Sequence, residues 1–300
     1  MKLRQTTLAL LLLLVAPLMA QESNDEAGIW SEIGIEKAIT KKWDVGLDME
    51  YRAQNKARVS VGLGTSYKVN KYLKFGLSYS FLYSCKADKY KDKSEGEVGA
   101  DYWKIGHNFT PEYWYPRHRF NVEATGSIKL MNWLKISLRE RYQLTYAGER
   151  TYDKYVYRED WSMQPQYIID GWDWIYTGDV PEMNGDPTDE WRVETKPAYY
   201  DQVLRSRLKF EYDKKRCPYS PFVSAEFHNS VSVGDHMLLQ KIRTAVGCSY
   251  KFRKHNEVSL AYIITFDMFD TEENTTTLET ETIRLHDRMH TINIGYKYSF

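Results

Sequence analysis

The sequence lacks any apolar run long enough to form a membrane-spanning helix, which needs roughly 20 consecutive apolar residues. Its longest apolar run, at residues 8–15, is far shorter. A helical membrane protein is therefore excluded. The chain also lacks a net charge, with 41 Lys and Arg against 41 Asp and Glu. This balance argues against a nucleic-acid partner, because proteins that bind nucleic acids favour a basic face.

Cysteine is scarce as well. Cys85, Cys217 and Cys248 are an odd number and lie far apart in the sequence, so at most one disulfide can form within the chain. We place Cys248 on the outer face of a strand and the other two in different loops. No structural disulfide is therefore expected.

The N-terminus carries the three parts of a secretory signal peptide. Lys2 and Arg4 precede the apolar run at 8–15, and Pro17 and Ala20 follow it. We predict a signal peptide at residues 1–20 and a mature chain at 21–300. Because Gln21 rather than Cys follows the predicted cut, the chain is not expected to be a lipoprotein.

Alternation of apolar and polar residues dominates the mature chain, and this period of two is the spacing of a β-strand with two unlike faces. Residues 43–51, 119–130 and 202–212 show it most clearly. The middle run is long enough to cross the hydrocarbon core at a tilt. In the last two runs the second face is wholly polar, so that face needs water or opposite charges beside it.

Eleven such runs are predicted. They fall at residues 29–38, 43–51, 58–67, 72–83, 119–130, 133–146, 202–212, 219–230, 240–251, 256–267 and 284–300. Short turns at 39–42, 68–71, 131–132, 213–218 and 252–255 alternate with generally longer loops at 53–57, 84–117, 147–198, 231–239 and 268–283. Short turns on one side and long loops on the other are typical of outer-membrane barrels.

The composition fits that class, because 15% of the residues are aromatic and such barrels carry aromatic girdles at both membrane interfaces. A soluble β-sandwich would also give alternating strands. It does not explain the sided loop lengths or the terminal alternation that ends in Phe300. We therefore predict an all-β fold: a transmembrane antiparallel β-barrel of about 10 to 12 strands with long extracellular loops, in a bacterial outer membrane.

Two details depart from the simple pattern. Bacterial single-chain barrels have even strand numbers, so either the run at 29–38 lies outside the ring, leaving ten strands, or a further strand precedes it. Glu140 falls on the apolar face of its strand, which a bulge or a position near the outer rim would explain.

Several segments resemble the uncharacterised outer-membrane barrels grouped as domain of unknown function 2490. They are WSEIGIEKAITKKWDVGLDMEYR, VNKYLKFGLSYSFLY, RHRFNVEATGSIKLMNWLKISLRERYQ, LRSRLKFEYDKKRCPYSPFVSAEFHNS and the closing NIGYKYSF. The resemblance covers nearly all of the mature chain. It implies the fold and the location, and it implies no activity or site residue.

The polar faces are rich in charge of both signs. A candidate lumen cluster comprises Arg139, Arg141, Arg205, Arg207, Glu123, Glu226 and Arg243. In a small barrel these charges would neutralise one another across the lumen. The alternative is a permeation path lined by arginines.

The segment 147–198 is a second candidate region, with Trp161, Trp172, Trp174 and Trp191 among twelve acidic and five basic residues. So many aromatics favour an ordered cap or an inward-folded plug over disorder. The Trp faces are candidates for ligand binding, such as stacking on a glycan. Asp170, Asp173, Asn184, Asp186 and Asp189 do not have the spacing of a calcium loop, and no cofactor or metal is predicted.

His228 and Ser230 share one face of a strand, where an imidazole could activate a hydroxyl. The pair faintly resembles that of outer-membrane phospholipases, but Val231 and Ser232 replace the Asn and Gly of that family, and His228 points into the barrel. We therefore predict a non-enzymatic barrel with a narrow or plugged lumen, whose role is surface binding or passage of a small polar solute. A structural envelope protein and a lipid-acting hydrolase are the alternatives.

Overall fold

The computed structural model describes residues 26–53, 57–95, 102–170, 173–231, 237–253, 255–268 and 285–300. The predicted signal peptide and Trp172 lie outside these residues. The described part of the chain consists of β-strands and their connections, and it contains no helix long and apolar enough to cross a membrane.

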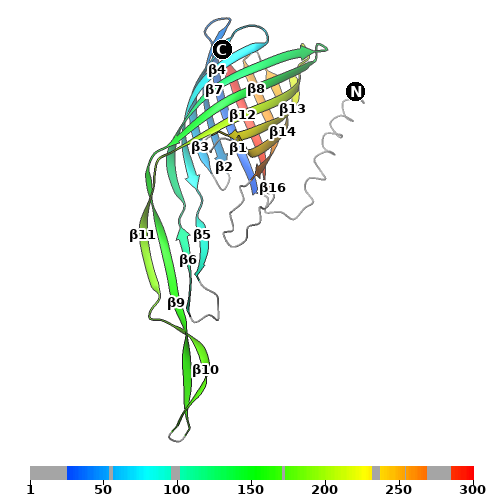
Figure 1. Cartoon of the computed structure of the whole chain (residues 1–300). Coiled ribbons are helices and arrows are strands. Elements are labelled where there is room, and N and C mark those ends of the chain that lie inside the picture. Colours follow the sequence, from blue (N-terminus) through cyan, green and yellow to red (C-terminus); the bar gives the residue numbers. More distant parts are fainter. Residues whose placement is uncertain are drawn as a thin grey trace.

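Eleven strands form a closed barrel, in the order β1-β16-β15-β14-β13-β12-β8-β7-β4-β3-β2 (Figure 1). They are β1 (Glu26–Ala38), β2 (Trp43–Ala53), β3 (Arg58–Lys68), β4 (Leu73–Lys86), β7 (Tyr113–Leu130), β8 (Leu134–Ala147), β12 (Tyr199–Tyr212), β13 (Tyr219–Ser230), β14 (Leu238–Phe252), β15 (Asn256–Met268) and β16 (Leu285–Ser299). The predicted all-β barrel is confirmed, and each of the eleven predicted runs corresponds to one barrel strand.

The barrel closes through a parallel pair, β1 with β16, in which Ile29 lies opposite Ile292 and Ile35 opposite Tyr298. The other neighbouring pairs in the ring are antiparallel. Both explanations offered for the strand count are wrong, because the run at 29–38 is part of the ring and the ring has eleven strands. An odd number of up-and-down strands leaves the first and last running the same way, so they can only pair in parallel.

The two faces of the barrel strands separate as the alternation predicts. Large apolar side chains point outward and are exposed, for example Leu63, Leu77 and Leu260. Charged and small polar side chains point inward. All three cysteines are free, as expected, although Cys85 lies at the end of β4 rather than in a loop.

Glu140 is the exception on the outer face. It lies in the middle of β8, opposite Ser206 on β12 and Ala124 on β7, with no register shift on either side. The bulge and the rim position are therefore both wrong. The Ser206 hydroxyl donates a hydrogen bond of 2.6 Å to the Glu140 carboxylate instead.

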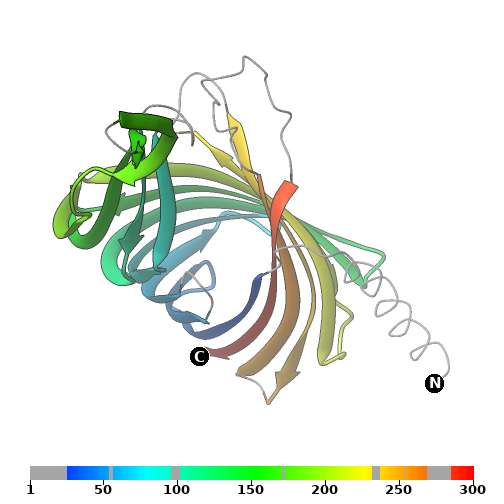
Figure 2. The ribbon, with the colours of Figure 1, turned by 90° about the horizontal axis from the view of Figure 1, so that it is seen from below.

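A second sheet occupies two of the predicted loops. It consists of β5 (Lys89–Glu95), β6 (Tyr102–Thr110), β9 (Arg150–Asp170), β10 (Asp173–Met183) and β11 (Thr188–Lys196). The strand β9 pairs with β6 on one side and with β11 and β10 in succession on the other. We call this sheet the extension. Figure 1 shows it projecting away from the barrel, at the end opposite the short turns. The segment 147–198 is ordered, as expected, but the inward-folded plug is wrong, and Figure 2 shows the extension beside the ring when the barrel is viewed along its axis.

The short turns at the other end are fixed by local contacts. The Thr40 hydroxyl oxygen accepts hydrogen bonds from the backbone N–H groups of Lys42 and Trp43, at 3.2 and 3.0 Å. Between β7 and β8, Met131 and Asn132 have φ angles of 52° and 55°. These are left-handed conformations of the kind that two-residue hairpin turns require.

Replacing Met131 with Gly should stabilise the folded barrel by about 0.5 to 1 kcal/mol, because an L-residue in the left-handed region is strained and Gly is not. The Met131 side chain is 75% exposed, so its removal costs little packing. Urea unfolding in lipid vesicles measures the difference. The control is Lys41→Gly, at a turn residue that is not among those with positive φ, which should lower stability. Equal effects of the two variants would contradict the strain argument.

Candidate functional site

The lumen is lined by the inward positions of the barrel strands. Its main cavity has a volume of about 660 Å³. Ten of the lining residues are basic and five are acidic. The basic ones are Arg52, Arg58, Arg119, Arg139, Arg141, Arg205, Arg207, Lys209, Arg243 and Lys297, and the acidic ones are Glu32, Asp48, Glu50, Glu226 and Glu257. A second cavity of about 320 Å³ shares part of this lining and adds Glu36, Asp44, Lys74 and Glu123.

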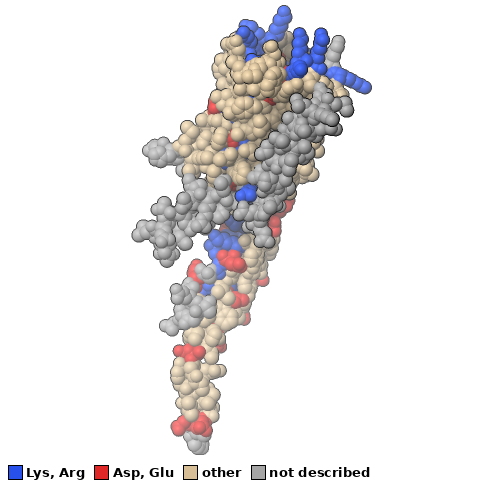
Figure 3. All heavy atoms as spheres, turned by 90° about the vertical axis from the view of Figure 1, so that its right-hand side faces the viewer, with Lys and Arg blue, Asp and Glu red and all other residues tan. Residues whose placement is uncertain are grey.

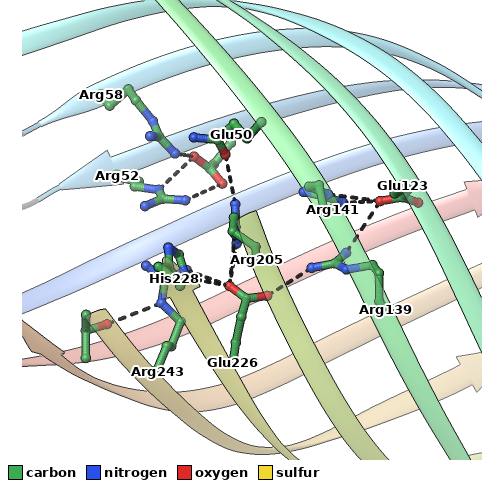
Figure 4. Close-up of polar contacts among 12 residues, drawn as sticks. Glu50, Arg52, Arg58, Glu123, Arg139, Arg141, Arg205, Glu226, His228 and Arg243 are labelled. Atoms are coloured by element: carbon green, nitrogen blue, oxygen red, sulfur yellow. Dashed lines mark hydrogen bonds and ion pairs between the residues drawn. The ribbon is translucent and has the colours of Figure 1, made fainter. Parts of the chain in front are cut away.

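Glu226 is the centre of the largest ion-pair network (Figure 4). One of its oxygens lies 2.5 Å from Arg205 and 3.6 Å from Arg243, and the other lies 3.0 Å from Arg139. His228 Nε2 lies 2.8 Å from the first oxygen. Strand pairing accounts for the arrangement, because Glu226 lies opposite Arg243 on β14. Three guanidinium groups therefore share a single carboxylate.

Arg139 joins a second carboxylate to this network, because it also lies 3.9 Å from Glu123. Glu123 accepts hydrogen bonds from Arg141 at 2.9 and 2.6 Å, and these two residues are paired across β7 and β8. A separate cluster joins Glu50 to both Arg52, at 2.7 Å, and Arg58. In both groups the arginines outnumber the carboxylates.

Arg119 and Arg207 carry the unmatched charge. Among the residues that the structure describes, neither forms an ion pair with a carboxylate. Arg119 makes one long hydrogen bond, 3.4 Å to the Thr145 hydroxyl. It is repelled by Arg58 and Arg205 and attracted by Asp201. Arg207 lies opposite Glu226 in the β12–β13 ladder, but that carboxylate already pairs with three other arginines. Guanidinium groups that outnumber the carboxylates among them favour an anion.

An aromatic side chain stabilises part of this positive charge. Trp30 points inward from β1 and is only 3% exposed. The guanidinium carbon of Arg52 lies 3.7 Å from its ring centroid, and that of Arg243 lies 4.8 Å from it. Cation–π attraction of this kind is strengthened where the pair is shielded from water.

The predicted lumen cluster is brought together as a group. Arg139, Arg141, Arg205, Glu123, Glu226 and Arg243 are joined by ion pairs, and Arg207 lines the same cavity. The candidate list omitted Trp30, Arg52, Arg58 and Arg119. The alternation could have placed three of them on the inward face. Trp30 lies two residues before Glu32, Arg52 two residues after Glu50, and Arg119 two residues before Asn121.

The predicted loop aromatics lie apart from the lumen. Trp161 stacks on Trp103, with ring centroids 6.3 Å apart, while Trp174 and Trp191 are exposed on the extension. His228 points into the barrel, as expected. Within the described residues, its hydrogen bond is to Glu226 and none joins it to Ser230. No group of His, Cys, Asp and Glu among those residues could hold a metal ion.

Comparisons with known proteins give one family. The model of the family described as protein of unknown function (DUF2490) matches residues 27–276. No curated protein matches the chain. A solved structure, the CymD monoaromatic hydrocarbon channel, is 10% identical, with 80% of this chain and 82% of that chain covered and a TM-score of 0.32. At that TM-score no property of the channel is carried over to this chain.

Removing the Glu226 carboxylate should destabilise the barrel by about 3 kcal/mol, because three buried guanidinium groups would lose their shared partner. The variant is Glu226→Gln, which keeps the side-chain shape, and urea unfolding in lipid vesicles measures the loss. Glu257→Gln is the matched control, since Glu257 also lines the cavity but pairs only with the exposed Lys251, at 3.8 Å. That pair should be worth less than about 1 kcal/mol. Equal stability of wild type and Glu226→Gln would refute the network's structural role.

Proposed function

The chain belongs to the DUF2490 family of proteins of unknown function, and we propose that it is an outer-membrane barrel whose lumen binds small anions and passes them slowly. The observation that carries this proposal is the twofold excess of Arg and Lys over Asp and Glu around the main cavity. Rings of cationic side chains select anions in narrow pores. The low dielectric of the barrel wall strengthens their field inside the lumen.

The outer surface supports insertion into a membrane. Exposed aliphatic and aromatic side chains cover the outward face of consecutive strands, for example Ile33, Leu47 and Leu63. The barrel strands have 11 to 18 residues, which is enough to cross the hydrocarbon core at a tilt. In water such a surface would be an aggregation hazard, whereas in lipid it is the expected one.

The ends of the barrel support an orientation. Short turns face the periplasm in outer-membrane barrels, and long connections face outward. Figure 3 shows Lys and Arg side chains gathered at the end of the barrel that is remote from the extension. The short turns at that end contain Lys41, Lys42, Lys71, Lys214 and Lys215. The extension would then stand on the cell surface.

The size of the cavity supports a small solute. A barrel of this strand number is largely filled by side chains, and wide aqueous channels belong to larger barrels. The ion pairs of Glu226 reach β12 and β14, which are neighbours of β13, and β8, which is the next strand beyond β12. They therefore stay on one side of the wall and leave a central space of about 660 Å³. Slow passage of a small polar anion fits this volume better than free diffusion of larger molecules.

A lipid-acting hydrolase finds no support in the geometry. Its candidate base, His228, faces the lumen beside Glu226, away from the apolar outer belt where acyl chains would lie. A structural envelope protein without transport is the remaining alternative. Such a protein would conduct no ions across a planar bilayer.

Reversal potentials of the refolded protein in planar bilayers, measured in a KCl gradient, test the proposal. We expect small anion-selective currents. The double variant Arg119→Gln and Arg207→Gln should lower the ratio of chloride to potassium permeability several-fold, because it removes the two arginines without carboxylate partners. Lys214→Gln, on a turn outside the cavity, should leave the ratio unchanged. Cation selectivity, or silence from protein shown to be inserted, would exclude the anion path.

Excising the extension should leave these currents unchanged, because it projects away from the lumen. In the shortened chain, tight turns replace residues 87–112 and 148–198. Both segments that form the extension are thereby removed together. Single-channel conductance before and after excision is the measurement. A large rise in conductance would mean that the extension obstructs the lumen, contrary to the structure.

A further inference from the structure

The extension has two unlike faces. Strand pairing places Tyr90, Asp92, Trp103, His107, Phe109, Asp153, Tyr155, Tyr157, Glu159, Trp161, Asp189 and Trp191 on one of them, which we call the aromatic face. The same pairing places nine basic residues on the opposite face, which we call the basic face: Lys89, Lys91, Lys93, Lys104, Arg150, Lys154, Arg158, Arg192 and Lys196. Four acidic residues, Glu95, Asp160, Glu190 and Glu194, lie among them. Every Lys and Arg of the described part of β5, β6 and β11 lies on the basic face, as do those of β9.

A continuous row of rings crosses four strands of the aromatic face. Tyr90 on β5 stacks on His107 on β6 with centroids 4.8 Å apart, and His107 stacks on Tyr157 on β9 at 5.1 Å. His107 also contacts Tyr155 at 5.8 Å, and Tyr155 contacts Trp191 on β11 at 5.3 Å. The row therefore follows the hydrogen-bonding direction of the sheet and spans three interstrand spacings, about 14 Å.

The two ends of this row are open. Tyr90 is 59% exposed and Trp191 is 60% exposed. Neither side chain is needed to cover a core, because the extension is a single sheet that projects from the barrel (Figure 1). Large apolar patches that stay exposed to solvent commonly mark binding sites.

Carboxylates are held beside the rings. Glu159 accepts hydrogen bonds from the Tyr157 hydroxyl at 2.5 Å and from Trp161 Nε1 at 3.0 Å. These bonds lower the pKa of Glu159 and raise the pKa of Tyr157. A hydrogen bond to Asp189 likewise raises the pKa of Tyr155. The Glu159 carboxylate therefore stays ionised and the two phenols stay protonated near neutral pH, and the carboxylate keeps free lone pairs for further donors.

These features define the chemistry of an occupant. Inside the row the rings stack on one another, and the exposed rings of Tyr90 and Trp191 at its ends offer flat apolar surfaces, on which the C–H faces of sugar rings stack. The carboxylates offer only acceptors, which suit hydroxyl and amide N–H donors. Four carboxylates and no Lys or Arg on this face repel an anionic molecule. We propose that the aromatic face of the extension is a binding site for an uncharged oligosaccharide, with sugar rings stacked on Tyr90 and Trp191 at the two ends of the row and hydroxyl groups bound by the carboxylates between them.

This site is separate from the lumen and does not depend on anion passage. A cationic peptide is the competing occupant, because it would also suit the carboxylates. It would not need exposed aromatic rings at both ends of the row, whereas sugar units stack on such rings. The basic face supplies a matched control surface on the same strands.

Calorimetric titration of the full-length protein in detergent, with chitohexaose and maltohexaose as separate probes, tests the proposal. We expect at least one of these uncharged oligosaccharides to bind and to change the tryptophan fluorescence. Trp191→Ala should weaken that binding about tenfold or more, since it removes an exposed ring at the end of the row. Arg192→Ala, the adjacent residue on the basic face, should leave the affinity unchanged.

Three results would overturn the proposal: no binding of either oligosaccharide to folded protein, binding that Trp191→Ala does not weaken, or equal weakening by Arg192→Ala. A lysine pentamer serves as the cationic peptide probe. Binding of that pentamer in place of the oligosaccharides would assign the face to a peptide instead. Circular dichroism of each variant confirms that the strands of the extension remain formed.

Discussion

The parallel ladder between β1 and β16 closes the barrel, and the arrangement of every inward side chain depends on it. Eleven backbone pairs from Glu26 and Met289 to Glu36 and Ser299 form this ladder. Without it both strands would present unpaired N–H and C=O groups beside the apolar outer face, and such groups are costly in an apolar environment. Closure also fixes the register around the ring, and a slip of one residue in any pair would exchange the charged face of a strand with its apolar face.

Register explains how so many charges fit into a small lumen. Glu226 lies opposite Arg243 and Glu123 opposite Arg141, so strand pairing sets opposite charges beside one another. Glycine makes room for the carboxylates. A Cβ atom at Gly62 would lie 2.5 Å from a carboxylate oxygen of Asp48, and one at Gly76 would lie 2.8 Å from Glu123 Cγ. The wall is thus built to hold acidic groups, yet around the main cavity five acidic residues face eight arginines.

The extension uses the same period of two for a different purpose. In the barrel the alternation separates an apolar outer face from a charged lumen. In the extension it separates most aromatic residues from Lys and Arg, while carboxylates lie on both faces. For this reason the sequence pattern did not predict the strands of the extension. Neither face of β9 between Thr151 and Glu159 is uniformly apolar, so the segment lacks the contrast in hydropathy by which a strand is recognised. Its length and its aromatic content indicated only that it was ordered.

The sequence by itself determined the strands of the barrel, their inward and outward faces and most members of the lumen cluster. These follow from the local alternation of residues such as Arg205, Arg207 and Lys209, which needs no knowledge of distant partners. Tertiary structure decided how the ring closes, where the segment 147–198 goes and which charges meet. The contact of Trp30 with Arg52 follows from the β1–β2 hairpin, but its contact with Arg243 on β14 brings together strands from opposite ends of the chain. Such contacts depend on strand order and register around a closed ring, which are long-range properties that no local pattern encodes.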